Sequence, residues 1–281
     1  MYTFRLSVMA LAAGLAMPSG ANGAVYGGCK FNSETLSFAG SATEQADCLL
    51  RKVKPKGTGS TSQKIPQWLL TRITIAPDVS AQQLKTYLDK KGISPDDVGG
   101  AVASGDAESL RYFVIHDTSY PEETGSFPKN IDDASYKGNN LRIWTGIKDR
   151  VHLIITRDGR SRTFNDWKAS RSKAGVKIES ASRAPQSKKV FAHVENVQPR
   201  IKPANSFAWI APEPGLSPKQ QERLALAYIV ASVRAGQWLI PAFHFNIDEG
   251  LPDGHDDPQN VDLASWVKVI GTIHSELISI R

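Results

Sequence analysis

The stretch "YFVIHDTSYP", residues 112 to 121, places a histidine at the end of a run of strand-forming residues. The run predicts a buried β-strand over Tyr112 to Ile115, because aromatic and β-branched side chains pack well on a pleated sheet. His116 then lies at the rim of that sheet. A histidine in this position is either a core residue with its ring nitrogens hydrogen-bonded or a metal ligand, and partners elsewhere in the chain must distinguish the two.

A second apolar run also stops at a histidine. In "LIPAFHFNIDEGLPDGHDDP", residues 239 to 258, the run ends at His244, and a loop rich in Gly, Pro and Asp follows. Two strand-end histidines and one carboxylate suit a catalytic zinc site, because zinc binds imidazole and carboxylate while one position stays open for water. The two stretches together therefore predict a zinc site at one edge of a sheet.

Further strands and helices alternate beyond the first strand. Val151 to Thr156 is predicted to be a strand that enters a hairpin through the turn Arg157 to Arg160, and Val190 to Asn196 is predicted to be another strand. In the latter, His193 and Glu195 share one face, since side chains alternate along a strand. Strands alternating with helices indicate an α/β fold, with a mixed central sheet flanked by helices.

Two helices in this region have clear end signals. Ser217 and Pro218 suit the N-cap and the first helical position of one helix, and Gly236 suits its C-terminal stop. The last helix is expected from about Leu263 to Ile280, where apolar residues recur at helical spacing. Asp262 immediately precedes that helix and is its expected N-cap.

Residues 1 to 24 are expected to be a secretory signal peptide. Arg5 is their only charge, an apolar run follows it, and small residues lead up to Ala24. The segment is too short to remain as a bilayer-spanning anchor. We therefore expect an exported protein, periplasmic or extracellular after signal removal, with no permanent membrane anchor.

Residues 25 to 104 are expected to form an N-terminal extension, and residues 105 to 281 the catalytic domain. Within the extension, helices are predicted over about Glu44 to Arg51, with Thr43 as N-cap, and over about Ala81 to Lys91.

The chain has two cysteines, Cys29 and Cys48, both in this extension. An even pair in an exported chain favours a disulfide, which would close a loop of roughly twenty residues and contribute about 3 kcal/mol. Two free thiols are the alternative. Neither cysteine has another Cys or His at ligand spacing, so we do not expect a metal site there.

The composition is that of a globular protein, with 41% hydrophobic and 22% charged residues and a net charge of +6. Between residues 142 and 189 there are thirteen Lys or Arg against four Asp or Glu. Such a basic region suits an anionic partner, and for an exported protein we expect carboxylate-bearing peptides of a bacterial wall and not nucleic acid. The alternative is a solvated basic region without a partner.

Five segments carry a family resemblance through their order in the chain. They are "FVIHDTS", "VHLIITRDGR", "DWKAS", "FAHVEN" and "FHFNIDEGLPDGHDDP". In that order they resemble the zinc-dependent N-acetylmuramoyl-L-alanine amidase family, which includes the peptidoglycan recognition proteins. That family typically shows a strand ending in a ligand histidine, an "aHyiI-x-x-DG" hairpin, a "WHAG" element, a "GIE" strand and a "GH…K-x-DPG" tail. The resemblance covers about Arg111 to Trp266.

The resemblance implies a role for each matching residue. His116 matches the first zinc ligand, His244 the second, and Asp257 the carboxylate ligand of the "DPG" element. Glu195 matches the glutamate of the "GIE" strand, which implies a general base for the zinc-bound water. His255 lies two residues before Asp257, where the family often has a lysine that stabilises the oxyanion, and a protonated His255 would take that role.

Two of these assignments have competitors within the chain. His255 is an alternative to His244 as ligand. Asp262 is an alternative to Asp257, which we favour because Asp262 is explained as a helix N-cap. The chain also departs from the family in two places: "WHAG" is replaced by residues 167 to 170, "WKAS", and the tail between His244 and Asp257 is longer than usual.

The remaining histidines and two tryptophans have plainer expectations. His193 is expected to be a hydrogen-bonded surface or rim residue, although its strand face would also allow a place in the site. His152 is expected to be structural, and His274 to face solvent on the last helix. Trp167 and Trp209 would suit a glycan groove, but burial is the commoner fate of a tryptophan.

By resemblance, the chain is expected to be a zinc-dependent amidase. It would hydrolyse the amide between N-acetylmuramic acid and the L-alanine of the stem peptide, in peptidoglycan or in released muropeptides, with Zn²⁺ as cofactor. One alternative is a peptidoglycan-binding protein that has the same fold without catalysis. Another is an exported toxin with the same chemistry that degrades a competitor's wall.

Overall fold

The structure, a computed structural model, describes residues 23–54, 59–204 and 206–280. The expected signal peptide, apart from its last two residues, lies outside this part of the chain. Among the described residues, no helix has both the length and the apolarity that crossing a membrane requires.

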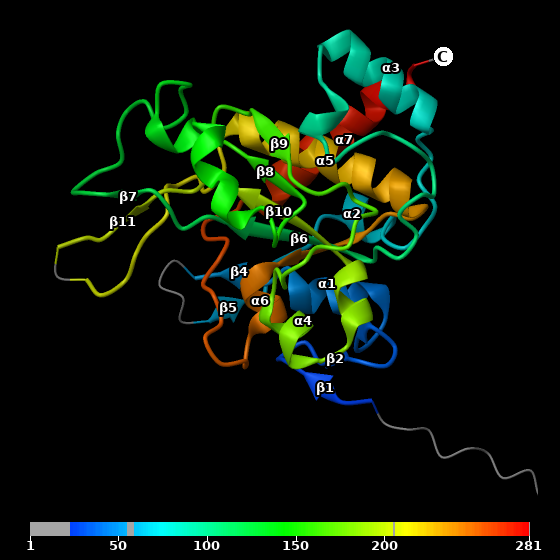
Figure 1. Cartoon of the computed structure of the whole chain (residues 1–281), viewed down its shortest axis with the longest axis horizontal. Helices are drawn as coiled ribbons and strands as arrows, with labels where there is room; N and C mark the ends of the chain where they lie inside the picture. The colour runs from blue at the N-terminus through cyan, green and yellow to red at the C-terminus, as the bar shows by residue number, and fades with distance from the viewer. Residues whose placement is uncertain (1–22, 55–58, 205, 281) are drawn as a thin grey trace, which may run out of the picture.

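A five-stranded mixed sheet lies at the centre of the molecule (Figure 1). Its strand order is β12-β6-β10-β8-β9, in which the first four strands are parallel and β9 runs antiparallel to β8. The strands are β6 (Tyr112–Asp117), β8 (Leu153–Ile155), β9 (Ser161–Thr163), β10 (Phe191–Asn196) and β12 (Ile240–Phe243). The prediction of a mixed central sheet, including the β8–β9 hairpin, is confirmed.

The register of the sheet brings the ends of three strands together. Glu195 on β10 lies opposite His116 on β6, and Phe243 at the end of β12 lies opposite Ile115. His244 follows Phe243 directly, so both histidines leave the sheet at its carboxyl edge. In α/β sheets this edge is where ligands usually bind.

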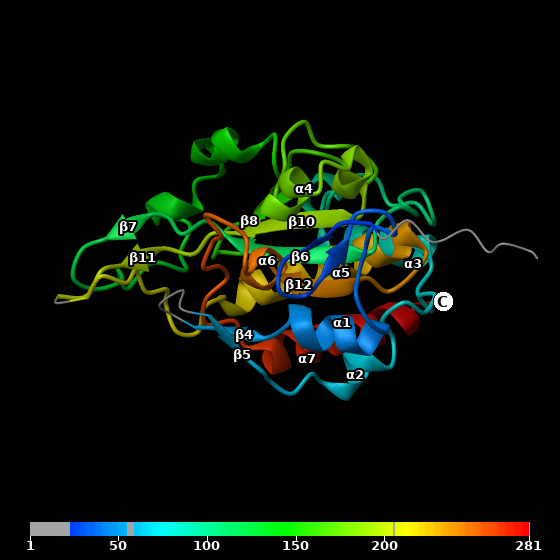
Figure 2. The same cartoon turned by 90° about the horizontal axis from the view of Figure 1, so that it is seen from below.

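Helices cover both faces of the sheet, as predicted. Figure 1 shows α5 and α7 on one side and α1, α4 and α6 on the other, and Figure 2 shows α4 beside β8 and β10. The two remaining helices, α2 and α3, pack against α7. The helices are α1 (Ala42–Leu49), α2 (Gln67–Leu70), α3 (Ala81–Lys91), α4 (Lys177–Ala181), α5 (Pro218–Ala235), α6 (His244–Asp248) and α7 (Leu263–Ile278).

Short strands and 3₁₀ turns make up the rest of the ordered elements. β1, β2 and β3 form a small antiparallel sheet, β4 pairs with β5, and β7 pairs with β11. The strands are β1 (Val25–Tyr26), β2 (Phe31–Asn32), β3 (Ser37–Phe38), β4 (Lys52–Val53), β5 (Ser60–Thr61), β7 (Glu122–Glu123) and β11 (Arg200–Ile201). The 3₁₀ helices are η1 (Pro95–Asp97), η2 (Lys137–Asn139), η3 (Leu141–Ile147) and η4 (Pro185–Lys189).

Most of the predicted helix ends are confirmed by their caps. Ser217 accepts a hydrogen bond from the Gln220 amide to begin α5, and Asp262 caps α7 through the Ser265 amide. The first helix differs from its prediction, because Ser41 and not Thr43 is its N-cap. Ser41 forms a reciprocal capping box with Glu44, a pairing that starts the helix two residues earlier.

The leading region shares one hydrophobic core with the central sheet. Phe31 and Phe38 pack against Phe191 and Tyr112, with ring centroids 5.6 and 5.0 Å apart respectively. The Tyr112 hydroxyl also donates to Gln45 and accepts from the Phe38 amide. Residues N-terminal to the sheet therefore pack directly on β6 and β10 and stabilise them.

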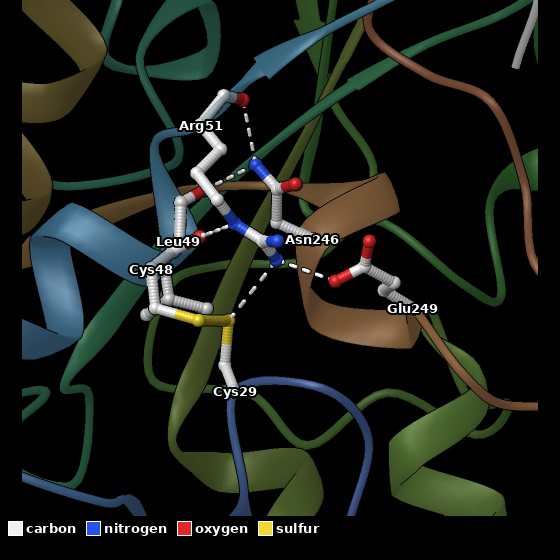
Figure 3. Close-up of a disulfide and its surroundings, with 6 residues drawn as sticks. All are labelled: Cys29, Cys48, Leu49, Arg51, Asn246 and Glu249. Atoms are coloured by element: carbon white, nitrogen blue, oxygen red, sulfur yellow. Dashed lines mark hydrogen bonds and ion pairs between the residues drawn. A yellow bond between two sulfur atoms is a disulfide. The ribbon is translucent and has the colours of Figure 1, made fainter. Parts of the chain in front are cut away.

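The predicted disulfide between Cys29 and Cys48 is confirmed (Figure 3). It joins the loop before β2 to the last turn of α1, and Arg51 lies over it, donating from Nε to the Cys48 carbonyl at 2.9 Å. Disulfides are typical of proteins in oxidising compartments.

The residues just after Cys48 contact α6 through polar groups (Figure 3). The side chain of Asn246 in α6 donates to the carbonyl oxygens of Leu49 and Arg51 at 3.0 and 2.8 Å. The Arg51 guanidinium forms an ion pair with Glu249, just after α6, at 2.6 Å. These contacts hold the short helix whose first residue is His244.

Candidate metal centre

The three predicted metal ligands converge in the structure. His116 comes from β6, His244 begins α6, and Asp257 comes from the loop between α6 and α7. One ligand atom from each lies within 4.8 Å of the other two, and all three side chains are buried. The Nδ1 atoms of His116 and His244 are 2.9 Å apart. Asp257 Oδ1 lies 3.0 Å from His244 Nδ1, and Asp257 Oδ2 lies 3.8 Å from His116 Nδ1. This buried group could bind a metal ion.

His244 reaches this position in a way that the sequence pattern did not predict. The strand ends at Phe243, and His244 opens a short helix instead of ending the strand. The helix places Asp248 one turn after His244, and its carboxylate lies 2.9 Å from His244 Nε2. The outer nitrogen of this ligand is thereby held by a carboxylate, as is common for histidines that bind metals.

The outer nitrogen of His116 is held by a longer chain of contacts. His116 Nε2 lies 2.8 Å from Nδ1 of His193, whose Nε2 lies 3.2 Å from Glu179. Glu179 in turn forms a fully buried ion pair with Arg171. An ionised carboxylate only accepts hydrogen bonds, so a neutral His193 carries its hydrogen on Nε2 and accepts at Nδ1. His116 then donates from Nε2 and keeps a free lone pair on Nδ1.

The hydrogen-bond pattern fits a cation between the three ligands. With both outer nitrogens donating, two Nδ1 lone pairs and a carboxylate face one another. Three acceptors at such short distances repel unless a proton or a metal ion lies among them. Imidazole and carboxylate are ligands that zinc accepts, as are several other divalent ions.

Electrostatics indicate where a proton resides when no metal is bound. Burial lowers the pKa of His244, but the carboxylates of Asp257 and Asp248 outweigh it and raise this pKa well above its usual value. Burial, with the charge of His244, lowers the pKa of His116 well below its usual value. These directions favour an added proton on His244 over one on His116, and a bound metal ion would compete with that proton.

A surrounding network fixes the position of Asp257. Its Oδ2 accepts from the backbone amide of Asp117 at 3.0 Å, and its carbonyl oxygen accepts from the Phe245 amide at 2.8 Å. Both Asp117 oxygens accept from Arg200 at 2.7 Å. Burial raises the pKa of Asp117 to about 6, although the Arg200 charge opposes this.

Glu195 lies beside the cluster with a carboxylate oxygen unused. It pairs with His116 across the sheet, and its buried Oε2 has no hydrogen-bond partner among the described residues. Burial, with the nearby charges of Asp257 and Asp117, raises the pKa of Glu195 well above its usual value. A buried carboxyl group with a raised pKa is well suited to taking up and returning a proton.

The cluster and Glu195 open into a cavity of about 560 Å³. Trp144 and Ile147 line one part of it, and residues 174 to 177 line another. Arg150 and Lys177 from the basic region also line the cavity. Other members of that region are buried in ion pairs, including Arg171, so the region is not simply a solvated loop.

The structure separates the competing site residues. His255 lies at the rim with its side chain 60% exposed, its ring 4.9 Å from that of His244 and its Nδ1 3.9 Å from Asp257. His244 and not His255 therefore belongs to the cluster. Asp262 caps α7, which leaves Asp257 as the clustered carboxylate.

Two histidines differ from their predictions. His193 was expected at the surface or rim but is completely buried, because α4 and the segment before it cover this face of β10. His274 was expected to face solvent but is buried, with Nε2 at 2.7 Å from Asp78. It packs between Trp68 and Trp238, because α7 is covered on the α2 side as well as on the α5 side.

Other expectations agree with the structure. His152 is structural: it accepts from the His193 amide at 3.0 Å and packs on Trp167. Trp167 is buried, with its indole N–H donating to the Val98 carbonyl, and does not line the cavity. Trp209 also lies away from the cavity lining.

The supporting residues Asp248 and Glu179 were missed by the sequence analysis. The spacing of four between His244 and Asp248 would have been a signal, had "HFNID" been recognised as helical. Glu179 is sixteen residues before Glu195 on a separate element, and no local pattern connects it with His193.

Comparisons with protein-family models, with curated proteins and with solved structures found no match to this chain.

Proposed function

We propose that this protein is a zinc-dependent hydrolase that cleaves the amide between N-acetylmuramic acid and L-alanine in peptidoglycan or muropeptides. The observation that carries the proposal is the buried group of His116, His244 and Asp257 with the unpartnered Glu195 carboxylate in the same cavity. The ordered segments that resemble the zinc amidase family supply the substrate class.

His116, His244 and Asp257 would hold the zinc ion. Bound there, zinc would polarise the amide carbonyl and lower the pKa of a coordinated water from about 16 to about 7. Burial keeps the three ligands away from bulk water and so strengthens their attraction for a cation.

Glu195 is the proposed general base. It takes a proton from the attacking water as the oxygen bonds to the amide carbon. It then returns the proton to the amide nitrogen, which leaves as the amino terminus of the stem peptide. The absence of a competing hydrogen-bond donor at Oε2 among the described residues leaves this oxygen free for water.

His255 is the proposed group that stabilises negative charge on the carbonyl oxygen. It lines the cavity with a side chain that is 60% exposed, and its Nδ1 lies 3.9 Å from Asp257. When protonated it presents N–H donors to an oxygen bound beside the cluster. Arg150 and Lys177 add positive charge to the cavity wall, which suits stem peptides that carry carboxylates.

Export is the matching proposal for location. The N-terminal sequence has the features of a signal peptide, and the Cys29–Cys48 disulfide is typical of an oxidising compartment.

The decisive experiment is mass spectrometry of peptidoglycan digested by the zinc-loaded protein. We expect free stem peptides beginning with L-alanine and glycan strands with intact sugar linkages. Glu195→Gln is the matched control: it should lower kcat by about 10²- to 10⁴-fold while zinc content remains unchanged.

Each other outcome supports a different function. Cleavage between sugars or between peptide residues would overturn the amidase proposal. Zinc binding with peptidoglycan retention and no turnover in the wild type would instead support a binding protein.

A further inference from the structure

One short segment contacts the outer supports of both ligand histidines. It comprises residues 174–181, that is α4 and the three residues before it, and is called the α4 segment below. The Asp248 carboxylate, which holds His244 Nε2, also accepts from the backbone amides of Lys177 and Ile178 at 2.7 and 3.0 Å. His244 is thus tied through one carboxylate to the first turn of α4.

The same segment supports the other ligand through its own side chain. Glu179, in the middle of α4, lies 3.2 Å from Nε2 of His193, and His193 Nδ1 lies 2.8 Å from His116 Nε2. Glu179 is held by its ion pair with Arg171 and by the Gly175 amide at 2.6 Å. The side chains of Glu179, Arg171 and His193 are completely buried, so the chain of contacts has little freedom to rearrange.

Close packing at Gly175 shows how tightly the α4 segment approaches His193. A β-carbon at position 175 would lie 2.6 Å from His193 Nδ1 and 2.7 Å from an Arg171 nitrogen. Both distances are shorter than real β-carbon contacts, so a side chain here would displace the imidazole or the guanidinium. Glycine is therefore required for the backbone to pass over the ring.

The α4 segment is also a wall of the candidate substrate cavity. Ala174, Gly175, Val176, Lys177 and Ser180 all line it. Residues that line the cavity and residues that hold the two outer supports, Asp248 and His193, thus belong to one continuous stretch of eight residues.

We propose that the α4 segment, acting through His193 and Asp248, is the positioning element that sets the metal affinity of the site. It fixes the ring orientation and the proton location of both ligand histidines. This inference rests on the proposed metal centre and adds His193, Glu179 and Asp248 as positioning residues that touch neither metal nor substrate.

The role of His193 follows from the direction of its hydrogen bonds. Glu179 can only accept, so it keeps the His193 hydrogen on Nε2 and leaves Nδ1 as an acceptor. That acceptor draws the His116 hydrogen to Nε2, which frees Nδ1 for the metal. Loss of the acceptor removes this bias, and loss of such an outer partner typically lowers metal affinity 10- to 100-fold.

Two substitutions of His193 separate this role from general packing. His193→Leu keeps side-chain volume but removes the acceptor, whereas His193→Asn can present its Oδ1 near the place of Nδ1. His274→Leu is a matched control, because it also removes a buried imidazole bonded to a carboxylate but lies away from the site. The measurement is zinc affinity of the full mature chain by competition with a chromophoric chelator.

We expect zinc affinity to fall by about 10- to 100-fold in His193→Leu, to recover largely in His193→Asn, and to be unchanged in His274→Leu. If His193→Leu does not fold, Gly175→Ala provides the test, since the added methyl pushes His193 away from His116 and should weaken zinc binding similarly. ¹⁵N NMR of the histidine rings gives a second reading: the zinc-loaded wild type should show the His116 hydrogen on Nε2.

Three results would overturn the inference or its basis. Wild-type affinity in the folded His193→Leu or Gly175→Ala protein would remove the positioning role. Equal losses in His193→Leu and His193→Asn would show that the acceptor is not what matters. A wild-type chain that binds no zinc would instead refute the metal centre itself, so the two failures are distinguishable.

Discussion

Two polar clusters of this protein, one around buried Arg234 and one around buried His116 and His244, differ in their balance of hydrogen-bond donors and acceptors. In the first, Arg234 at the end of α5 donates to Asp106 at 2.7 and 2.8 Å and to Asp166 at 2.6 and 3.1 Å. It also donates to the Gly99 carbonyl at 3.1 Å. One cation with five N–H donors thus meets two anions and a carbonyl, and every partner is complementary.

The second cluster, around His116 and His244, has too many acceptors. When its rings are neutral, two imidazole lone pairs meet the carboxylate of Asp257, and the carboxyl group of Glu195 lies close by with an oxygen that has no partner among the described residues. Natural folds rarely bury acceptors without donors, and exceptions are expected at functional sites. The comparison teaches that the Arg234 cluster is complete in itself, whereas the histidine cluster presents acceptors that could bind a metal ion.

The largest expected effect on stability comes from Arg234→Met. Removing the cation leaves Asp166 without its ion-pair partner and Asp106 with only Lys168, at 3.8 Å. Breaking a fully buried pair costs about 3 to 5 kcal/mol. We expect about 3 kcal/mol, since the two aspartates keep 26% and 29% exposure and can recover water. Chemical denaturation measures the loss. A cost below about 1 kcal/mol would contradict a stabilising role for the Arg234 cluster. An altered zinc affinity in the folded variant would contradict its independence from the histidine cluster.

Zinc should stabilise the protein through the histidine cluster alone. At a free zinc concentration 100 times Kd, the wild type should gain about 2.7 kcal/mol in its free energy of unfolding. Asp257→Asn should lose most of this gain, because it replaces an anionic ligand by a neutral amide of the same shape. Thermal unfolding with and without zinc measures both, and Arg234→Met should keep the full gain. An equal gain in Asp257→Asn would argue that zinc binds elsewhere.

A smaller effect is expected from pH in the zinc-free protein. The folded-state pKa of Glu195 lies well above the usual 4.5, because burial and the nearby carboxylates disfavour its charge. Above pH 4.5 the folded chain therefore holds a proton that the unfolded chain has released, and the free energy of unfolding falls as pH rises. This contribution reaches at most about 1.4 kcal/mol per pH unit for one group.

Glu195→Gln isolates that contribution, since the amide does not titrate. Relative to the variant, the wild type should lose stability as pH rises from 4.5 through the raised pKa of Glu195. Urea denaturation across pH 4.5 to 8 provides the comparison. Parallel stability profiles for the two proteins would show that Glu195 is not held in an unfavourable environment for its charge.

Short sequence patterns correctly predicted features that depend only on residues close together in the chain, such as helix starts. The cap residues Ser217 and Asp262 identified the starts of α5 and α7, because an N-cap hydrogen bond spans only three residues. Short apolar runs likewise placed His116 and His244 near the ends of two strands, although His244 begins α6. Parallel strands end at a common edge, so these positions already suggested proximity.

Short sequence patterns could not predict features that depend on contacts between distant parts of the chain. The burial of His193 depends on α4 folding over β10, and that of His274 depends on α7 being covered on two sides. Glu179 supports His116 through a residue on a different strand, a relation without any sequence spacing. The pairing of Ile115 with Phe243 sets how far along the sheet His116 and His244 lie relative to each other. This register depends on both strands and cannot be predicted from either segment alone.

The contact between the end of α1 and α6 links the oxidation state of Cys29 and Cys48 to the site. Asn246 lies two residues after His244, and its side chain donates hydrogen bonds to backbone carbonyls at and just after the end of α1. The bond between Cys29 and Cys48 restrains this part of the backbone. Without that bond, residues 29 to 48 have more conformations to lose when the end of α1 takes its place beside α6. A chain with reduced thiols would thus order the helix that carries His244 less readily than the oxidised chain.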